Sequence, residues 1–361
     1  MTPAFVLIAA VVGARAAPPT VAPIGTYNVS TTSGIVYAAG LVCPTSVSSC
    51  AWTVLPPSKR TGYAAQNLTL DTYLPSAPVP DGRSRPAIIC IHGGGYVGGD
   101  SKHENCDVMG PMFASAGFAA FSINYRLRDD AGNVPAQWPA NCGNPKEPLC
   151  ANRSSDLKGD LAWMPQYAYP AVRDAKAAVR WVRAHASELG VDPDYITVYG
   201  GSAGGTTVTA LGLLREDDYK SEVSAQEDPT MTTTNPGVSS RVACVIDHWG
   251  SDWMARQLWQ RGAGAGYAPD NPPIAIFHGT KDTTVPYALE TSRIVGGYNA
   301  SGAPWALFPV AGAGHGAWGA DTGHGLTSCR GPACSNLLDL ESEEDRVTFQ
   351  FVVQQLKLQL Q

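Results

Sequence analysis

A serine in a glycine-rich turn is the residue of this sequence best suited to covalent chemistry. Ser202 is the central residue of a G-x-S-x-G motif at residues 200–204. Residues 194–199 are mostly β-branched or aromatic and predict a short buried strand, whereas residues 206–214 can form a helix. A tight strand-to-helix turn requires small residues around the serine and holds its hydroxyl out at the carboxyl edge of a sheet. Taken alone, the motif also fits a serine without a catalytic role in a glycine-rich turn.

A serine hydroxyl is a weak nucleophile near neutral pH, so it needs a base within reach and a carboxylate that orients this base. Asp282 follows an expected strand at residues 274–279, and His315 follows another at residues 305–310 with small neighbours. In the chain order Ser, Asp, His, we assign His315 as the general base and Asp282 as its orienting carboxylate.

Other acids and histidines compete for these roles. Asp247 and Asp252 also follow a strand, but one strand too early for the usual acid. His324 has similar glycine neighbours but lies beyond the end of the last strand. His278 ends a strand and is expected to make structural hydrogen bonds. The remaining histidines, His103, His185 and His248, have no motif around them.

An H-G-G-G motif at residues 92–95 is suited to binding a developing negative charge. Glycines let backbone N–H groups approach an oxyanion closely. The N–H groups of Gly94 and Gly95, with that of Ala203 after the serine, form the expected oxyanion hole. We expect the His92 ring to brace this loop.

Several aromatic residues are candidates for substrate contact. Tyr96 directly follows the glycine loop, and Trp249 follows an expected strand. Trp138 and Trp163 lie in a long irregular segment. Packing in the core or in a cap is the alternative for most of these rings.

Strand-like and helix-like segments alternate along the chain, which predicts a mainly parallel central sheet flanked by helices. Most expected strands are continuous apolar runs, but the alternating pattern of residues 66–75 predicts an antiparallel edge strand. The other expected strands are residues 35–38, 86–92, 118–127, 194–199, 241–247, 274–279 and 305–310. The expected helices are residues 108–116, 170–188, 206–214, 287–296 and 343–360. Because ligands bind beyond the carboxyl ends of parallel strands, the polar motifs that follow these strands should meet at one edge.

Two stretches lack this alternation. Residues 128–168 are rich in proline and aromatic residues and predict an inserted cap or loop, although an excursion remote from the site is an alternative. Residues 215–240 are polar and predict a loop. In the helix between them, Val172, Ala175 and Val179 form an apolar face, with the basic residues largely elsewhere.

The 361 residues, 44% apolar and 16% charged, describe a globular protein with an ample core. Residues 1–16 are apolar with an A-x-A ending and predict a signal peptide, which leaves residues 17–361 as a single domain. A buried N-terminal strand is the alternative for the first segment. No stretch is long enough to span a membrane, and a net charge of −6 without a basic run gives nucleic-acid binding no support.

The cysteines and glycosylation sequons indicate an oxidising, extracellular environment. Three pairs of the nine cysteines are close in sequence, namely Cys43 with Cys50, Cys142 with Cys150, and Cys329 with Cys334. Cys90 and Cys244 lie in strand-like runs and are expected to be buried thiols, and Cys106 has no assigned partner. The sequons are at Asn28, Asn67, Asn152 and Asn299.

As a set, these motifs resemble the H-G-G-G esterases, which include the hormone-sensitive-lipase-like and the bacterial feruloyl-esterase-like carboxylesterases. The resemblance rests on residues 92–95, 124–127, 174–181 and 200–205 and covers about residues 65–320. It implies an α/β-hydrolase fold, no cofactor or metal, and hydrolysis of esters through an acyl-enzyme. Gly201 stands where hormone-sensitive-lipase relatives usually carry Asp, and the insertion and the cysteines are also unusual, so the substrate class does not carry over.

The sequence therefore predicts a secreted serine carboxylesterase that acts on a small-molecule or polymeric ester and does not insert stably into membranes. A peptidase or amidase on the same fold is one alternative. A catalytically inactive binding module is another, although such relatives usually lose the serine or the histidine and this chain keeps both.

Overall fold

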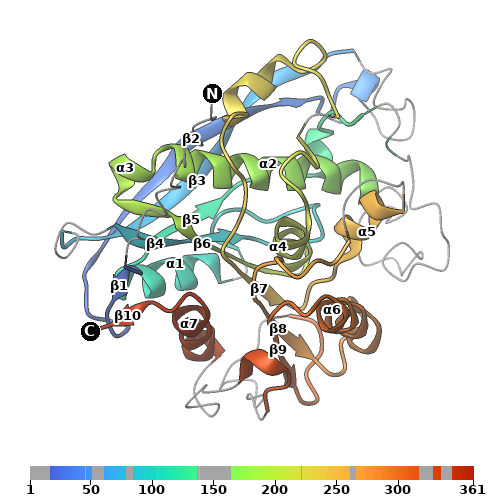
Figure 1. The fold of residues 1–361 in the computed structure, drawn as a ribbon. Coiled ribbons are helices and arrows are strands. Elements are labelled where there is room, and N and C mark those ends of the chain that lie inside the picture. Colours follow the sequence, from blue (N-terminus) through green and yellow to red (C-terminus); the bar gives the residue numbers. More distant parts are fainter. Residues whose placement is uncertain are drawn as a thin grey trace, which may run out of the picture.

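An eight-stranded sheet with helices on both faces forms the framework of the computed structural model (Figure 1). The described residues are 17–44, 46–50, 61–78, 84–103, 105–135, 138, 164–220, 222–260, 266–316, 328–334 and 344–361. The expected signal peptide and most of the expected insertion, with Trp163 and the Cys142–Cys150 pair, lie outside these residues, as does His324.

The strand order is β2-β3-β5-β4-β6-β7-β8-β9. Its members are β2 (Val29–Val42), β3 (Ala64–Pro75), β4 (Arg85–Ile91), β5 (Ala119–Ile123), β6 (Val191–Gly201), β7 (Cys244–His248), β8 (Ile274–Gly279) and β9 (Trp305–Val310). β2 and β3 run antiparallel to their neighbours, and the other pairs are parallel. The mainly parallel sheet is thus confirmed. The edge position expected for β3 is wrong, because β2 pairs along its outer side.

The helices divide between the two faces of the sheet. α1 (Cys106–Ser115) and α7 (Glu344–Gln355) share one core cluster. The other cluster holds α2 (Met164–Ala184), α4 (Ala203–Leu213), α5 (Trp253–Trp259) and α6 (Tyr287–Ser301). The short elements are β1 (Thr20–Val21), β10 (Gln359–Leu360), α3 (Ala186–Leu189), η1 (Ser48–Cys50), η4 (Arg128–Asp130), η6 (Pro229–Thr234) and η8 (Pro332–Cys334). This arrangement, with nearly every residue of β4 to β9 buried, is the α/β-hydrolase fold.

Helix α2 differs from its expected form in two ways. It begins at Met164, so its first turns belong to the segment expected as an insertion, and Pro170 lies inside it. Its basic side chains are also buried: Arg173, Lys176 and Arg180 are 5%, 2% and 2% exposed. The apolar face expected from the sequence is present, but the opposite face is covered as well.

The polar segment expected as a loop, residues 215–240, provides that cover. The Lys176 ammonium donates to the backbone carbonyls of Arg215 and Asp218 at 2.6 and 2.5 Å. Arg180 Nε donates to the carbonyl of Thr234 in η6 at 2.7 Å. Burial lowers the pKa of Lys176 to about 8. Carbonyl oxygens thus replace the water that these cations lose, which is how a polar segment can lie on a helix face.

A buried ion pair joins two of the sequence motifs that carry the family resemblance. Arg126, after β5, donates through Nη2 and Nε to the Asp174 carboxylate of α2 at 2.6 and 2.9 Å. Its Nη1 donates to the carbonyl of Leu41 in β2 at 3.0 Å. Both partners of the pair are almost fully buried. These motifs therefore fasten the helix to the antiparallel side of the sheet.

The cysteine expectations are partly confirmed. Disulfides join Cys43 to Cys50 and Cys329 to Cys334, and Cys244 is a buried free thiol. The buried thiol expected at Cys90 is wrong, because Cys90 forms a disulfide with Cys106. The end of β4 and the start of α1 lie close in space, with Cα atoms 5.6 Å apart, although 16 residues separate the two cysteines. No helix among the described residues is long and apolar enough to cross a membrane.

Candidate active site

The backbone of Ser202 has an unusual conformation between β6 and α4. Its φ is 55° and its ψ is −116°, in a region that residues with a Cβ rarely adopt. The Ser202 N–H donates to the carbonyl of His248 at the end of β7 at 2.9 Å. A Cβ added at Gly200 would lie 2.6 Å from the Ile91 carbonyl oxygen. The crowding expected for this turn is present, and it holds the serine between two strand ends.

Ser202, His315 and Asp282 form a continuous chain of hydrogen bonds. Ser202 Oγ and His315 Nε2 are 2.9 Å apart, and His315 Nδ1 and Asp282 Oδ2 are 2.8 Å apart. The carboxylate accepts the Nδ1 proton, which leaves Nε2 as the acceptor for the serine hydroxyl. This geometry suits removal of the serine proton during nucleophilic attack.

The Asp282 carboxylate is held by donors on both of its oxygens. Oδ1 accepts the N–H groups of Thr284 and Val285 at 2.8 and 3.0 Å. Oδ2 is shared by His315 and by His278 Nε2 at 3.1 Å. Burial by itself would raise the pKa of Asp282, but the hydrogen bonds from the two histidines outweigh it and hold the pKa at about 2. Asp282 is therefore ionised throughout the neutral range.

His278 is the residue of this site whose partner the sequence did not reveal. Structural hydrogen bonds were expected for it, but not with the carboxylate assigned to His315. The four-residue spacing of His278 and Asp282 across a strand end was the available signal. It was insufficient because the loop conformation decides whether the carboxylate turns back toward the strand.

The rival acids lie away from His315. Asp252 accepts from Arg256 Nε at 2.6 Å and from the Tyr267 hydroxyl at 2.8 Å. Asp247 is buried within β7, where its Oδ1 accepts the Gly250 N–H at 2.8 Å. Neither forms a hydrogen bond with His315 in the described part of the chain.

The glycine loop after β4 presents backbone N–H groups at the same edge of the sheet. Gly94 and Gly95 have φ values of 93° and 62°. The Gly94 carbonyl accepts from Val97 and Gly98 at 3.0 and 3.3 Å, which closes the turn. Among the described residues, no backbone acceptor in a turn or loop pairs with the N–H of Gly94 or Gly95. Together with Ala203 at the start of α4, these groups remain the proposed oxyanion donors.

His92 braces this loop, as expected. Its Nδ1–H donates to the Gly93 carbonyl at 2.8 Å, and its ring stacks on Tyr125 with centroids 4.2 Å apart. The Tyr125 hydroxyl donates to the His92 carbonyl at 2.8 Å. Burial lowers the pKa of His92 to about 4, so the ring is neutral at physiological pH.

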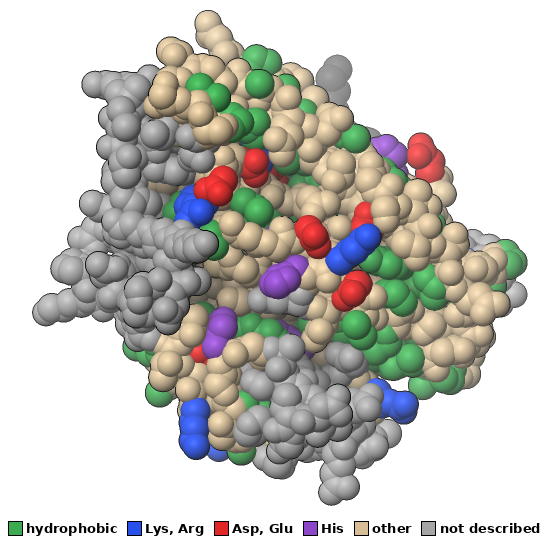
Figure 2. Space-filling model, turned by 180° about the vertical axis from the view of Figure 1, so that it is seen from behind, with side chains coloured by type: hydrophobic (Ala, Val, Ile, Leu, Met, Phe, Trp, Pro, Cys, Tyr) green, Lys and Arg blue, Asp and Glu red, His purple; other side chains and the backbone are tan. Residues whose placement is uncertain are grey.

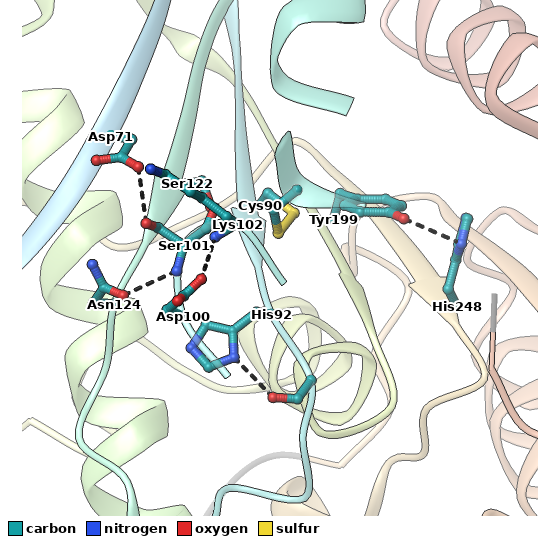
Figure 3. Close-up of a disulfide and its surroundings, with 12 residues drawn as sticks. Asp71, Cys90, His92, Asp100, Ser101, Lys102, Ser122, Asn124, Tyr199 and His248 are labelled. Atoms are coloured by element: carbon teal, nitrogen blue, oxygen red, sulfur yellow. Dashed lines mark hydrogen bonds between the residues drawn. A yellow bond between two sulfur atoms is a disulfide. The ribbon is translucent and has the colours of Figure 1, made fainter. Parts of the chain in front are cut away.

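The far end of the same loop is fixed to β3 and β5 (Figure 3). The Ser101 hydroxyl donates to Asp71 and its N–H donates to the Asn124 side chain, both at 2.9 Å. The Cys90–Cys106 disulfide spans the loop from strand to helix. The described residues of this loop are thus held at both ends, which keeps the glycine N–H groups in place without a ligand.

The described aromatic residues that are candidates for substrate contact are buried. Tyr96 is 1% exposed, and its hydroxyl lies 3.1 Å from Thr207 Oγ1 of α4, so it packs beneath the loop. Trp249 is also 1% exposed, with its ring centroid 6.4 Å from that of His315. Trp138 packs against Tyr169 in the core. Within the described residues, these three rings are packed in the interior, which matches the packing alternative.

The chain is similar to several proteins named as ester hydrolases. Residues 70–142 and 161–258 match the family model described as BD-FAE. The chain is 40% identical over 219 residues to a Mycobacterium tuberculosis protein named "Probable carboxylic ester hydrolase LipM", which covers 56% of this chain and 42% of that protein. It is 44% identical over 68 residues to an arylesterase of Saccharolobus solfataricus, which covers 19% of this chain and 22% of that protein.

A solved structure is also similar. It is a thermophilic esterase, Est2, from Thermogutta terrifontis, with 27% identity and a TM-score of 0.48 over 70% of this chain and 79% of that one. The chain spans less than half the length of the two curated relatives, at 42% and 22%.

Proposed function

We propose that this chain, an α/β-hydrolase related to the carboxylesterases, is a secreted serine carboxylesterase that works through an acyl-enzyme. The observation that carries the proposal is the hydrogen-bond chain from Ser202 through His315 to Asp282. The glycine loop and the similarity to ester hydrolases support it. Among the described residues, no group of His, Cys, Asp and Glu side chains is arranged to hold a metal ion.

The reaction begins when Ser202 Oγ attacks the ester carbonyl while His315 Nε2 takes the serine proton. The imidazolium that forms is stabilised by Asp282, and the N–H groups of Gly94, Gly95 and Ala203 stabilise the oxyanion. The tetrahedral intermediate collapses, and His315 returns the proton to the departing alcohol. Water then attacks the acyl-Ser202 ester by the same route, which releases the carboxylic acid and restores the serine.

The substrate is a small-molecule or polymeric ester and not a nucleic acid. On the face shown in Figure 2, described charged side chains of both signs are scattered and form no extended basic patch. This agrees with the net charge of −6. Phosphate recognition would require clustered basic side chains.

Hydrolysis of a p-nitrophenyl ester series, from acetate to palmitate with a feruloyl ester, tests this proposal. Ser202→Ala should abolish the activity, and a fluorophosphonate should label the wild type but not the variant. Ser292→Ala, the same change at an exposed serine of α6, is the matched control and should be fully active. A wild type that is inactive on every ester but cleaves p-nitroanilides would favour an amidase, and one that is inactive on both and unlabelled would favour a binding module.

Secretion and glycosylation are part of the proposal. The three disulfides among the described residues support an oxidising compartment. Asn28, Asn67 and Asn299 are all exposed, but the Asn299 side chain also accepts a hydrogen bond from Trp305 Nε1 at 2.9 Å. We expect glycans at Asn28 and Asn67 before Asn299 when the full chain passes through a eukaryotic secretory pathway. Peptide mapping after N-glycosidase treatment would show their occupancy, and a purely intracellular, unglycosylated product would contradict the proposal.

A further inference from the structure

His278 is bonded to the same carboxylate oxygen of the triad as His315. Its Nε2 lies 3.1 Å from Asp282 Oδ2 and 2.9 Å from the Val285 carbonyl oxygen. A carbonyl oxygen only accepts, and the Asp282 carboxylate is ionised, so Nε2 must carry a proton that both oxygens share. The side chains of His278 and Asp282 are 0% exposed. No water competes for this bond, which therefore persists in the folded protein.

The two oxygens of Asp282 are held by different kinds of donor. Oδ1 is fixed by the backbone N–H groups of Thr284 and Val285. Oδ2 is held only by imidazoles, those of His315 and His278, among the described residues. His278 is therefore the donor, besides His315 itself, that helps to fix Oδ2 in the described part of the chain.

A second buried carboxyl lies behind His278. Asp247 pairs with Ile276 in the β7–β8 register, and His278 is two residues further along β8. Successive side chains of a strand alternate between faces, so Asp247 and His278 are on the same face of the sheet. His278 Nδ1 and Asp247 Oδ2 are both buried without a hydrogen bond of good geometry among the described residues. The Thr209 hydroxyl of α4 also acts on the Asp247 carboxyl and lowers its pKa.

The proton on Asp247 bears on the contact between these two groups. Burial raises the pKa of Asp247 to about 6, and His278 acts against this rise. With Nε2 protonated, the neutral His278 ring offers only a lone pair at Nδ1, and an ionised Asp247 offers only lone pairs at Oδ2. Two buried acceptors on one face are best satisfied by a proton held between them or by a bridging water.

We propose that His278 is a positioning residue for the reaction: it holds Oδ2 of Asp282 toward His315 and is itself held through its Nδ1 by Asp247 on the neighbouring strand. The role rests on the proposed esterase activity, because it acts through the triad. It extends the path Ser202–His315–Asp282 by one imidazole and one carboxyl into the interior of the sheet.

The shared bond has a definite effect on His315. A carboxylate oxygen that already accepts a proton from His278 is a weaker acceptor for His315. Removal of this donor should strengthen the bond between the carboxylate and the protonated His315 ring, and it leaves Oδ2 held by His315 alone among the described residues. The titratable groups that face His278 are Asp282 on its own turn, Tyr287 on α6 and Asp247 on β7, with His315 beyond the carboxylate.

His278→Leu and His278→Gln separate positioning from packing. Leucine removes both ring nitrogens, whereas the glutamine amide can place an N–H where Nε2 lies. We expect His278→Leu to lower kcat about tenfold with KM within about twofold, because the change affects orientation and not substrate binding. The acid limb of its kcat/KM profile should move to higher pH by roughly 0.5 to 1 unit, which corresponds to one hydrogen bond. His278→Gln should restore most of kcat and the wild-type limb.

His185→Leu is the control for loss of a partly buried histidine. His185 bonds to the Trp181 carbonyl and precedes the start of β6, at the opposite end of that strand from Ser202. The His185→Leu variant should have the kcat and the pH profile of the wild type. Rates are expressed per active site, counted by exhaustive fluorophosphonate labelling, so that misfolded protein does not contribute.

Histidine side-chain nitrogen NMR gives a readout that does not depend on turnover. In the wild type, the Nδ1 resonance of His278 should lie away from the range of a bare acceptor, and Asp247→Asn should move it. An inactive wild type would refute the esterase proposal itself. An active wild type whose His278→Leu variant keeps its kcat and acid limb would refute only the role of His278, and an Nδ1 resonance insensitive to Asp247→Asn would refute the link to Asp247.

Discussion

Gly204 of the serine turn lies against the carbonyl oxygen of Ile91: a Cβ built on Gly204 would come within 2.0 Å of that oxygen. Ile91 is the last residue of β4, directly before the glycine loop. The helix that carries the serine and the strand that carries the oxyanion loop therefore touch through backbone atoms. This contact fixes the distance between the nucleophile and the expected oxyanion donors.

Gly204→Ala should prevent correct folding or lower the melting temperature by many degrees, because a backbone atom cannot move aside as a side-chain tip can. The expected loss in the free energy of unfolding exceeds the roughly 1–3 kcal/mol that extra methylene groups usually cost in a well-packed core. Thermal unfolding and soluble yield would measure it. Gly296→Ala, with open space around the added Cβ in α6, is the control and should stabilise the protein by up to about 1 kcal/mol. A soluble Gly204→Ala variant with wild-type stability would show that the two segments are further apart.

Asp282→Asn should lower kcat/KM by roughly a thousandfold or more, because an amide favours the wrong tautomer of His315 and does not stabilise its cation. The rate of fluorophosphonate labelling of Ser202 should fall in parallel. Asp252→Asn is the matched control, since Asp252 bonds to Arg256 and Tyr267 instead of a histidine. A loss of less than tenfold on Asp282→Asn would assign the orienting role to another group.

The buried His92 ring should make stability depend on pH between about 4 and 6.5. Its ordinary pKa of 6.5 applies to the unfolded chain, and burial lowers the pKa to about 4 in the folded protein. Below pH 6.5 the unfolded chain binds a proton that the folded protein refuses. The stabilisation is therefore complete above pH 6.5 and is lost as the pH falls to 4, by up to roughly 3 kcal/mol.

His92→Asn should remove this dependence, because an amide can keep the hydrogen bond to the Gly93 carbonyl but does not titrate. Asp247 also makes the folding stability depend on pH between about 4 and 6.5, but in the opposite direction. Its raised pKa of about 6 favours the folded state at lower pH. The comparison of wild type and variant cancels that contribution. Denaturant titrations at pH 7 and pH 5 would measure both proteins, and equal losses for the two would contradict the prediction.

Asp174→Ala should destabilise the protein by about 3–5 kcal/mol, because it leaves the Arg126 guanidinium buried without its counterion. Replacement of both partners by Met and Leu should recover much of this loss, since no charge remains to be desolvated. Asp129→Ala, which breaks the exposed pair with Arg128, is expected to change the unfolding free energy by less than about 1 kcal/mol. Urea denaturation would distinguish these cases, and a small effect of Asp174→Ala would mean that water reaches Arg126.

Much of the fold was readable from local sequence. Continuous apolar runs identified the central strands because a strand covered on both faces needs apolar side chains at every position, as in β4. Ser202, Asp282 and His315 could be assigned because parallel strands place their following residues at one edge. For the same reason the glycine loop could be placed beside them.

What the sequence determined by itself was the type of each residue and its position along a strand or helix. What only the tertiary structure decided was which distant segment covers it. The basic face of α2 is buried because residues 215–240 supply carbonyl oxygens, and Cys90 meets Cys106 because β4 and α1 come together. His278 meets Asp282 for the same kind of reason: a loop conformation turns the carboxylate back toward the strand end. Such contacts depend on the path of the chain between two positions, and periodicity and composition carry no record of that path.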